Sequence, residues 1–240
     1  MTTSGTYVYN PSLGDATVYA FNLCEIRPTA LTQEHMASAR MASNMVLARW
    51  SNQGVNLWAV DLQTVTLVAG QAAYPVPQET IVILDAYCTI APTGSASPTD
   101  RIILPISRTE YANYPNKLQQ GFPTVFWFDR LISSSRSSGS AGPQILLYPT
   151  PDGTSAQTLS YYRVRQLQDS NLTNGQTVEI PYLWMEAFAT ALAVRLAIIW
   201  KPEKAIALKS FADESYSIAS LANIETAQQY LSPMIGHYFQ

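Results

Sequence analysis

The chain has 240 residues and a formal net charge of −3, and only 13% of its residues are charged, against about 25% in a typical soluble domain. Neither half carries the basic excess of a phosphate-reading domain, which argues against sequence-specific nucleic-acid binding. Cys24 and Cys88 lie in apolar stretches without the spacing of a metal site or redox pair, so we expect buried free thiols. The N-terminus shows no secretory signal pattern, which indicates folding and assembly in a cytoplasm.

Residues 1–54 are expected to form a polar arm followed by helices. One helix is predicted over residues 13–25. A second should run from about Leu31 to Gln53, with Thr29 or Thr32 as its N-cap and Gly54 just past its end. Its apolar residues recur at helical spacing, which indicates one buried face.

Residues 55–178 are predicted to form an antiparallel β domain, because the apolar period changes to two after Val55. The connections are too short for crossover helices, so we expect five to six strands in a sandwich or small barrel. Ser107 and Glu110 form a capping-box pattern, which predicts a brief helix inserted into the sheet. The Ser-rich residues 131–142 are expected to form a mobile hairpin tip. The strands are expected near residues 60–68, 81–90, 102–104, 125–130, 145–148 and 159–164.

Residues 179–229 are predicted to form a helical hairpin. From Pro181 to Trp200, only Glu186 and Arg195 interrupt an apolar run, which is long enough to consider a membrane span. The internal arginine and the many alanines favour instead a helix buried on all sides by protein. Pro202 can begin the next helix. That helix carries an apolar stripe: Leu208, Phe211, Ile218, Leu221 and Ile224.

Residues 230–240 depart from the helical pattern and form an apolar arm. Pro233 and Gly236 break the arm, which is too short to build its own core. It therefore either folds back on its own domain or is donated to a partner as an extended peptide. The candidate binding residues of this arm are Tyr230, Leu231, Met234, Ile235, Tyr238 and Phe239.

The sequence lacks the motifs of nucleophilic catalysis, zinc proteases, P-loops and dinucleotide binding. Its two histidines, His35 and His237, lie in an amphipathic helix and in the terminal arm, where neither has the context of a catalytic base. We therefore predict no enzyme, no metal and no cofactor. Carboxylate pairs meet only in the fold, so a carbohydrate-active enzyme on the β domain stays an alternative.

Several stretches together resemble a known family. In chain order they are ASARMASNMVLARWSNQGVNLW, VAGQAAYPVP, RTEYANYPNK with GFPTVFWFDR, LLYPTPDG and PYLWMEAFATALAVRLA, and they cover most of residues 20–200. Their order resembles the head-to-tail adaptor (connector) proteins of short-tailed bacteriophages, including the tail tubular protein A type. The resemblance implies an α+β fold, in which N- and C-terminal helices form a bundle that carries an inserted antiparallel β-sandwich or small barrel.

The resemblance also implies a structural virion protein of the neck, assembled in the cytoplasm of a host bacterium. About a dozen copies would form an oligomeric ring that joins the portal protein to the tail nozzle protein and leaves a channel for non-specific passage of DNA during genome ejection. No membrane and no small-molecule substrate would be involved. The C-terminal arm would dock on the portal, and a baseplate or fibre-attachment subunit stays the structural alternative. The expected subunit or tail contacts are Trp127, Phe128, Trp184 and Arg195.

Overall fold

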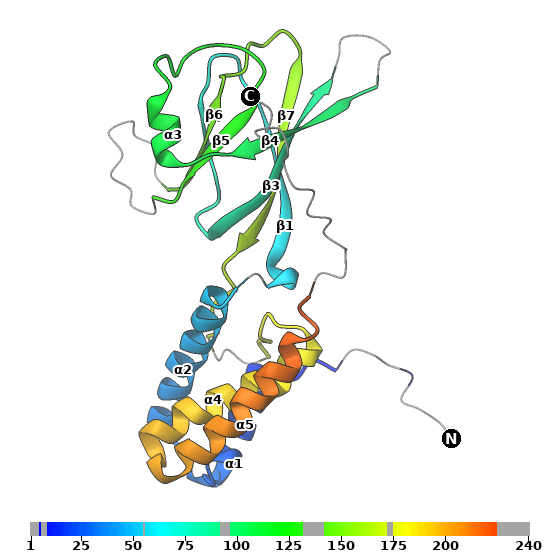
Figure 1. Cartoon of the computed structure of the whole chain (residues 1–240). Coiled ribbons are helices and arrows are strands. Elements are labelled where there is room, and N and C mark those ends of the chain that lie inside the picture. The colour runs from blue at the N-terminus through cyan, green and yellow to red at the C-terminus, as the bar shows by residue number, and fades with distance from the viewer. Residues whose placement is uncertain are drawn as a thin grey trace, which may run out of the picture.

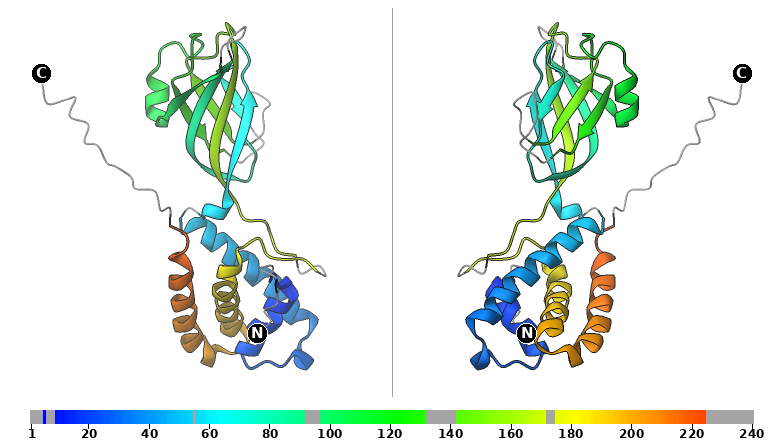
Figure 2. Two further views of the ribbon diagram at one scale, coloured as in Figure 1. Left: turned by 90° about the vertical axis from the view of Figure 1, so that its right-hand side faces the viewer. Right: turned by 90° about the vertical axis from the view of Figure 1, so that its left-hand side faces the viewer.

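The computed structural model describes residues 5, 9–54, 56–91, 97–131, 142–171 and 175–224. A helical bundle and a β domain stack end to end in this structure, and each has its own hydrophobic core (Figure 1). The chain passes from the first helices into the sheet and returns to the last helices, which pack beside the first (Figure 2). The predicted α+β class, with N- and C-terminal helices around an inserted sheet, is confirmed.

The bundle is built around its most apolar helix, α4 (Met185–Trp200), which packs against three other helices. These are α1 (Leu13–Leu23), α2 (Gln33–Asn52) and α5 (Pro202–Ser220). The described segment Tyr182–Trp200 is long and apolar enough to cross a membrane, yet half of its apolar window is buried inside the protein. Leu192, Ala193 and Leu196 are fully buried, as expected for the core helix of a bundle.

Local capping residues fix where these helices begin. The Ser12 hydroxyl accepts a hydrogen bond from the Asp15 backbone N–H at 3.2 Å, and the Asp15 carboxylate accepts one from the Ser12 backbone N–H at 3.2 Å. At α2 the cap is Thr32, whose backbone N–H donates to His35 Nδ1 at 3.2 Å. Pro202 occupies the first turn of α5, as its lack of an N–H predicts.

The β domain is one curled seven-stranded sheet in the order β1-β7-β3-β4-β5-β6-β2. The predicted count of five to six strands was too low, because the three-residue β2 is too short to show a period of two. The prediction of antiparallel pairing holds for every pair except β4 with β5, where Leu104 lies opposite Val125 in a parallel ladder. The strands are β1 (Val60–Thr66), β2 (Ala73–Pro75), β3 (Thr80–Ala91), β4 (Thr99–Pro105), β5 (Val125–Asp129), β6 (Gln144–Tyr148) and β7 (Ala156–Arg165).

The parallel pair is made possible by the long connection from Ile106 to Thr124, which contains the short helix α3 (Arg108–Asn113). Ser107 caps that helix and Glu110 completes the capping box, which confirms the prediction from those two residues. The connection was long enough for a crossover, although the sequence pattern alone suggested only a short helical insertion. Both cysteines are buried and free, as predicted.

The apolar stripe of α5 does not pack on α4 as one unit. The face of α5 that contacts the bundle combines the small buried residues Ala212, Ser215 and Ala219 with the partly buried Leu208 and Tyr216. Ile218 and Leu221 are 63% and 70% exposed. The Ser-rich tip predicted over 131–142 lies, except for its two end residues, outside the described residues, and so does the arm 230–240.

Candidate assembly surfaces

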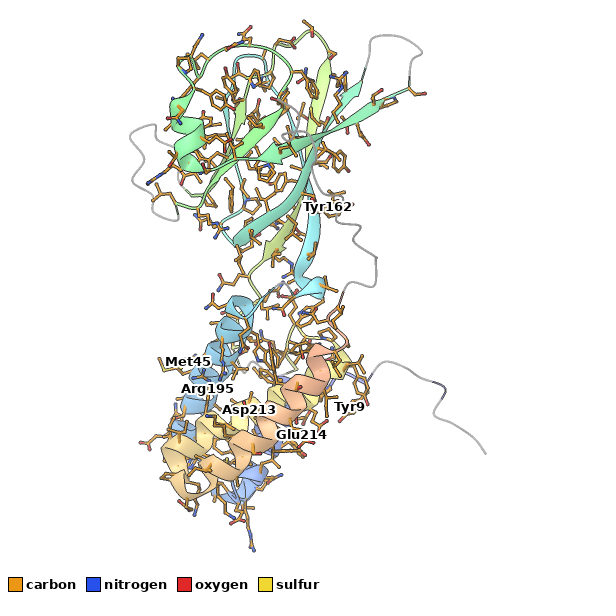
Figure 3. The ribbon with its side chains drawn as sticks, in the orientation of Figure 1. Tyr9, Met45, Tyr162, Arg195, Asp213 and Glu214 are labelled. Carbon is orange, nitrogen blue, oxygen red and sulfur yellow. The ribbon has the colours of Figure 1, made fainter. Side chains whose placement is uncertain are left out.

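Arg195 lies in a groove on one side of the bundle. It comes from α4, and its Nη1 lies 3.8 Å from Met45 Sδ of α2 (Figure 3). A cavity of about 330 Å³ extends from this arginine between α2 and α5, and a second of about 280 Å³ lies between α2 and α4. The two cavities meet at Arg195 and together form the groove. The second cavity is lined mainly by apolar side chains, so the groove combines an apolar wall with the positive charge of Arg195. The apolar side chains of that wall are Met41, Met45, Ile198 and Ile199, all of which are exposed.

The charges that line the groove are predominantly positive. Arg49, Arg195 and Lys209 line it from three helices, whereas Asp213 is the acidic residue on its α5 side. Among the described residues, the ion pairs involve Arg163, Arg165, Lys201 and Lys204, and Arg195 has no carboxylate within 4.0 Å. The half-buried guanidinium therefore has a methionine sulfur as its polar contact within the described chain.

The outer face of α5 forms a second apolar surface. Phe211, Ile218 and Leu221 are spaced by seven and three residues, so they lie on one side of the helix, and all are exposed. Glu214 lies within this stripe, between Phe211 and Ile218, and has no hydrogen bond or ion pair to another described residue. An apolar helix face that contains one carboxylate is thus presented to solvent.

Trp184 lies inside the bundle and not on a surface of the single chain. It ends the short 3-10 helix η3 (Tyr182–Trp184) and is only 3% exposed. Its ring centroid lies 5.2 Å from that of Trp50, 4.7 Å from Trp58 and 5.5 Å from Tyr216. This aromatic cluster joins α2, α4 and α5 close to the β domain. The described contacts therefore give Trp184 a packing role, and its role in subunit contact stays a prediction.

Trp127 and Phe128 lie on β5 and are both partly exposed. The Trp127 ring packs against Tyr111 of α3, with centroids 5.5 Å apart. Phe128 packs against the β core, and the Arg130 guanidinium lies 5.8 Å from the centre of its ring. Both residues line a hollow of about 250 Å³ whose other walls come from β3 and from the end of β4. Their predicted contact with another subunit is not tested by the single chain.

Two arginines of β7, Arg163 and Arg165, form ion pairs at the end of the sheet from which the chain returns to the bundle. The side chain of Arg163 is 4% exposed; its Nε and Nη2 donate to the Asp61 carboxylate at 2.7 and 3.0 Å, and its Nη1 donates to Glu79 at 3.2 Å. The hydrogen bond from Arg163 holds the pKa of Asp61 below its usual value. Arg165 pairs in the same way with Glu179, just before η3, and lowers the pKa of that carboxyl. These pairs fix the strands that connect the β domain to the bundle.

The described residues hold no cluster of three or more metal-ligating side chains. His35 stacks on Trp200, with ring centroids 4.1 Å apart, and its Nδ1 accepts the N–H of Thr32, so it serves helix packing and capping. The terminal arm, with His237 and the candidates Tyr230 to Phe239, lies outside the described residues. The sequence pattern indicated Arg195 but not the apolar wall beside it. Met41 and Met45, four residues apart on one side of α2, are the sequence feature that could have indicated this wall.

Two comparisons with known proteins complete this picture. A comparison with curated proteins finds no match. A family model described as SU10 adaptor protein matches residues 28–234, which run from the start of η1 (Pro28–Ala30) to beyond α5. Because this match covers most of the chain, the protein belongs to the SU10 adaptor protein family, a family of phage head-to-tail adaptors and not of enzymes.

Proposed function

We propose that this phage structural adaptor works as a ring of about a dozen copies between the portal and the tail nozzle, with a central channel for DNA. The observation that carries this proposal is the family match over residues 28–234. The low charge of the chain supports the channel, because each phosphate neutralised by a lysine or arginine would strengthen retention of DNA. The ring would form part of the virion neck and be assembled in the host cytoplasm.

The proposed ring needs two different contact surfaces on each copy, because a cyclic assembly with more than two members closes by heterologous contacts. The groove around Arg195 and the outer face of α5 supply two such surfaces on one bundle. We further propose that residues 1–54 and 179–229 act as the assembly domain, that residues 55–178 contact the tail through Trp127 and Phe128, and that the arm 230–240 binds the portal.

The test of this function is the mass of the assembly in the presence of its partner. Purified protein is measured by native mass spectrometry and negative-stain imaging, alone and after incubation with the cognate portal ring. A ring of near-dodecameric mass that appears chiefly on the portal is the expected result. A free trimer or hexamer that does not bind the portal would overturn the proposal and indicate a baseplate or fibre-attachment subunit.

The role of the arm is tested by deleting residues 230–240. The truncated chain should keep the circular dichroism spectrum of the full chain but lose binding to the portal ring. A matched control is a full-length chain in which the exposed β-domain residue Leu118 is replaced by serine. Portal binding by the truncated chain at the level of the control would refute the role of the arm.

A further inference from the structure

We propose that the groove around Arg195 receives the outer face of α5 from a second copy of this chain, with Glu214 of that copy paired with Arg195. The inference rests on the proposed ring and names the contact through which neighbouring copies would join. It is argued from two surfaces of the same chain that match in polarity and in charge.

The groove provides one half of this match. Its apolar wall, from Met41 and Met45 of α2 to Ile198 and Ile199 of α4, is exposed in the single chain. Arg195 is half-buried beside this wall and has no carboxylate partner among the described residues. A guanidinium that is partly removed from water is stabilised by a carboxylate that can accept a bidentate pair of hydrogen bonds.

The outer face of α5 provides the other half. Phe211, Ile218 and Leu221 form its apolar ridge, and Glu214 is the carboxylate within that ridge. Docking this helix face into a groove would bury the apolar residues of both surfaces while bringing one acid to one base. The remaining groove charges, Arg49, Lys209 and Asp213, sum to one further positive charge, which also favours an acidic ridge.

The two surfaces cannot satisfy each other within one chain. The groove opens on the side of α5 where Lys209, Ala212 and Asp213 lie, whereas Phe211 and Ile218 occupy a different side of the same helix. A pairing between copies is therefore heterologous, since each copy uses its groove toward one neighbour and its ridge toward the other. Such a contact propagates from copy to copy, and it forms a ring when the rotation between neighbouring copies closes.

Disulfide cross-linking tests this contact directly, because both native cysteines are buried and give no background reaction. Ile198→Cys places a thiol in the groove wall, and Ile218→Cys places one on the ridge. Under mild oxidation, a mixture of the two single variants should give dimers, and the double variant should give a ladder of higher multimers. Each single variant alone should stay monomeric on the gel. A two-fold contact, in which two copies exchange groove and ridge, would stop at the dimer in the double variant and give no ladder. The control pairs Ile198→Cys with Leu118→Cys, an equally exposed site on the β domain.

The reaction is run on purified protein and on protein bound to portal rings. Portal-bound rings without a ladder would overturn this contact and leave the adaptor function standing, whereas a ladder in protein that never binds the portal would keep the contact and refute the function. Absence of the ladder in both preparations overturns the contact. A ladder that appears only after removal of residues 225–240 would assign the groove to that segment in the full chain and would also overturn the contact.

A charge exchange tests the proposed ion pair. Arg195→Glu and Glu214→Arg should each abolish the ladder, and the chain that carries both changes should regain it. Asp85→Arg makes the same change of charge as Glu214→Arg at an exposed site on β3 and should leave the ladder intact. Failure of the double exchange to restore cross-linking, in a protein with a native circular dichroism spectrum, would refute the pairing of these two residues.

Discussion

Replacement of Asp61 by asparagine should destabilise the β domain, because it removes the charged partner of a nearly buried arginine. Arg163 donates two hydrogen bonds to the Asp61 carboxylate, at 2.7 and 3.0 Å, and is itself only 4% exposed. Breaking a fully buried ion pair costs about 3–5 kcal/mol. Asp61 is 33% exposed, and Arg163 keeps contacts with Glu79 at 3.2 Å and with the Thr80 hydroxyl at 2.8 Å. Solvent screening and these remaining partners reduce the expected loss to about 1–2 kcal/mol.

The measurement is the free energy of unfolding from urea titrations followed by circular dichroism, with Glu79→Gln as the matched control. Glu79 is 49% exposed and gives Arg163 a single longer contact, so its replacement should cost clearly less than that of Asp61. Equal losses for the two variants, or no loss for Asp61→Asn, would refute the assignment of Asp61 as the principal partner of Arg163.

The same pair predicts how the effect depends on pH. Arg163 holds the folded-state pKa of Asp61 below its value in the unfolded chain, which is about 3.9. A carboxyl with a lowered pKa contributes stability that is fully present above the unfolded pKa and is lost as the pH falls through the folded pKa. The difference between wild type and Asp61→Asn should therefore be the same at pH 7 and pH 5.5 and should shrink below about pH 4. A difference that instead grows in acid would contradict this linkage.

Two further predictions concern a turn and the thiols. Gly153 has a φ of +73°, and a Cβ added there would lie 2.7 Å from Ala69 Cβ. Gly153→Ala should therefore lower stability more than Gly175→Ala, because Gly175 has a similar φ of +77° but open space around it. Equal losses in thermal unfolding would contradict a steric clash at Gly153. Burial raises the pKa of both Cys24 and Cys88 to about 11, so neither should react with a thiol reagent at pH 8 until the chain unfolds, and fast labelling of the folded protein would contradict their burial.

Much of the fold could be predicted from local signals in the sequence. Ser107 with Glu110, and Pro202 after a long apolar run, mark helix starts by hydrogen-bonding chemistry that depends on only a few neighbouring residues. The parallel pairing of β4 with β5 could not be predicted in this way, because it depends on where a long connection places two strands in space. β2 was missed for a similar reason, since three residues cannot show a period.

The assembly surfaces were harder to predict, because the apolar residues of a helix show the same spacing in the sequence whether they face the core or a partner. Arg195 was selected as an interruption in an apolar run, and the structure places it in a groove; its role in assembly stays a prediction. Trp184 was predicted to contact another subunit or the tail, and that role stays a prediction. In the single chain its side chain packs in the aromatic cluster with Trp50 and Trp58, since a ring of that size is equally suited to a core.

The arrangement of α5 explains how folding and assembly can be separated in one helix. Ala212, Ser215 and Ala219 are buried in the hairpin with α4, and Leu208 and Tyr216 also pack against the bundle core, so the fold does not use the apolar side chains on the outer face of this helix. Ile218 and Leu221 are left exposed in the described part of the chain and are available for contact with another molecule. Polar substitution of Ile218 should therefore weaken contact between copies while leaving the stability of the chain almost unchanged, whereas a larger residue at Ala212 should do the opposite by forcing α5 away from α4.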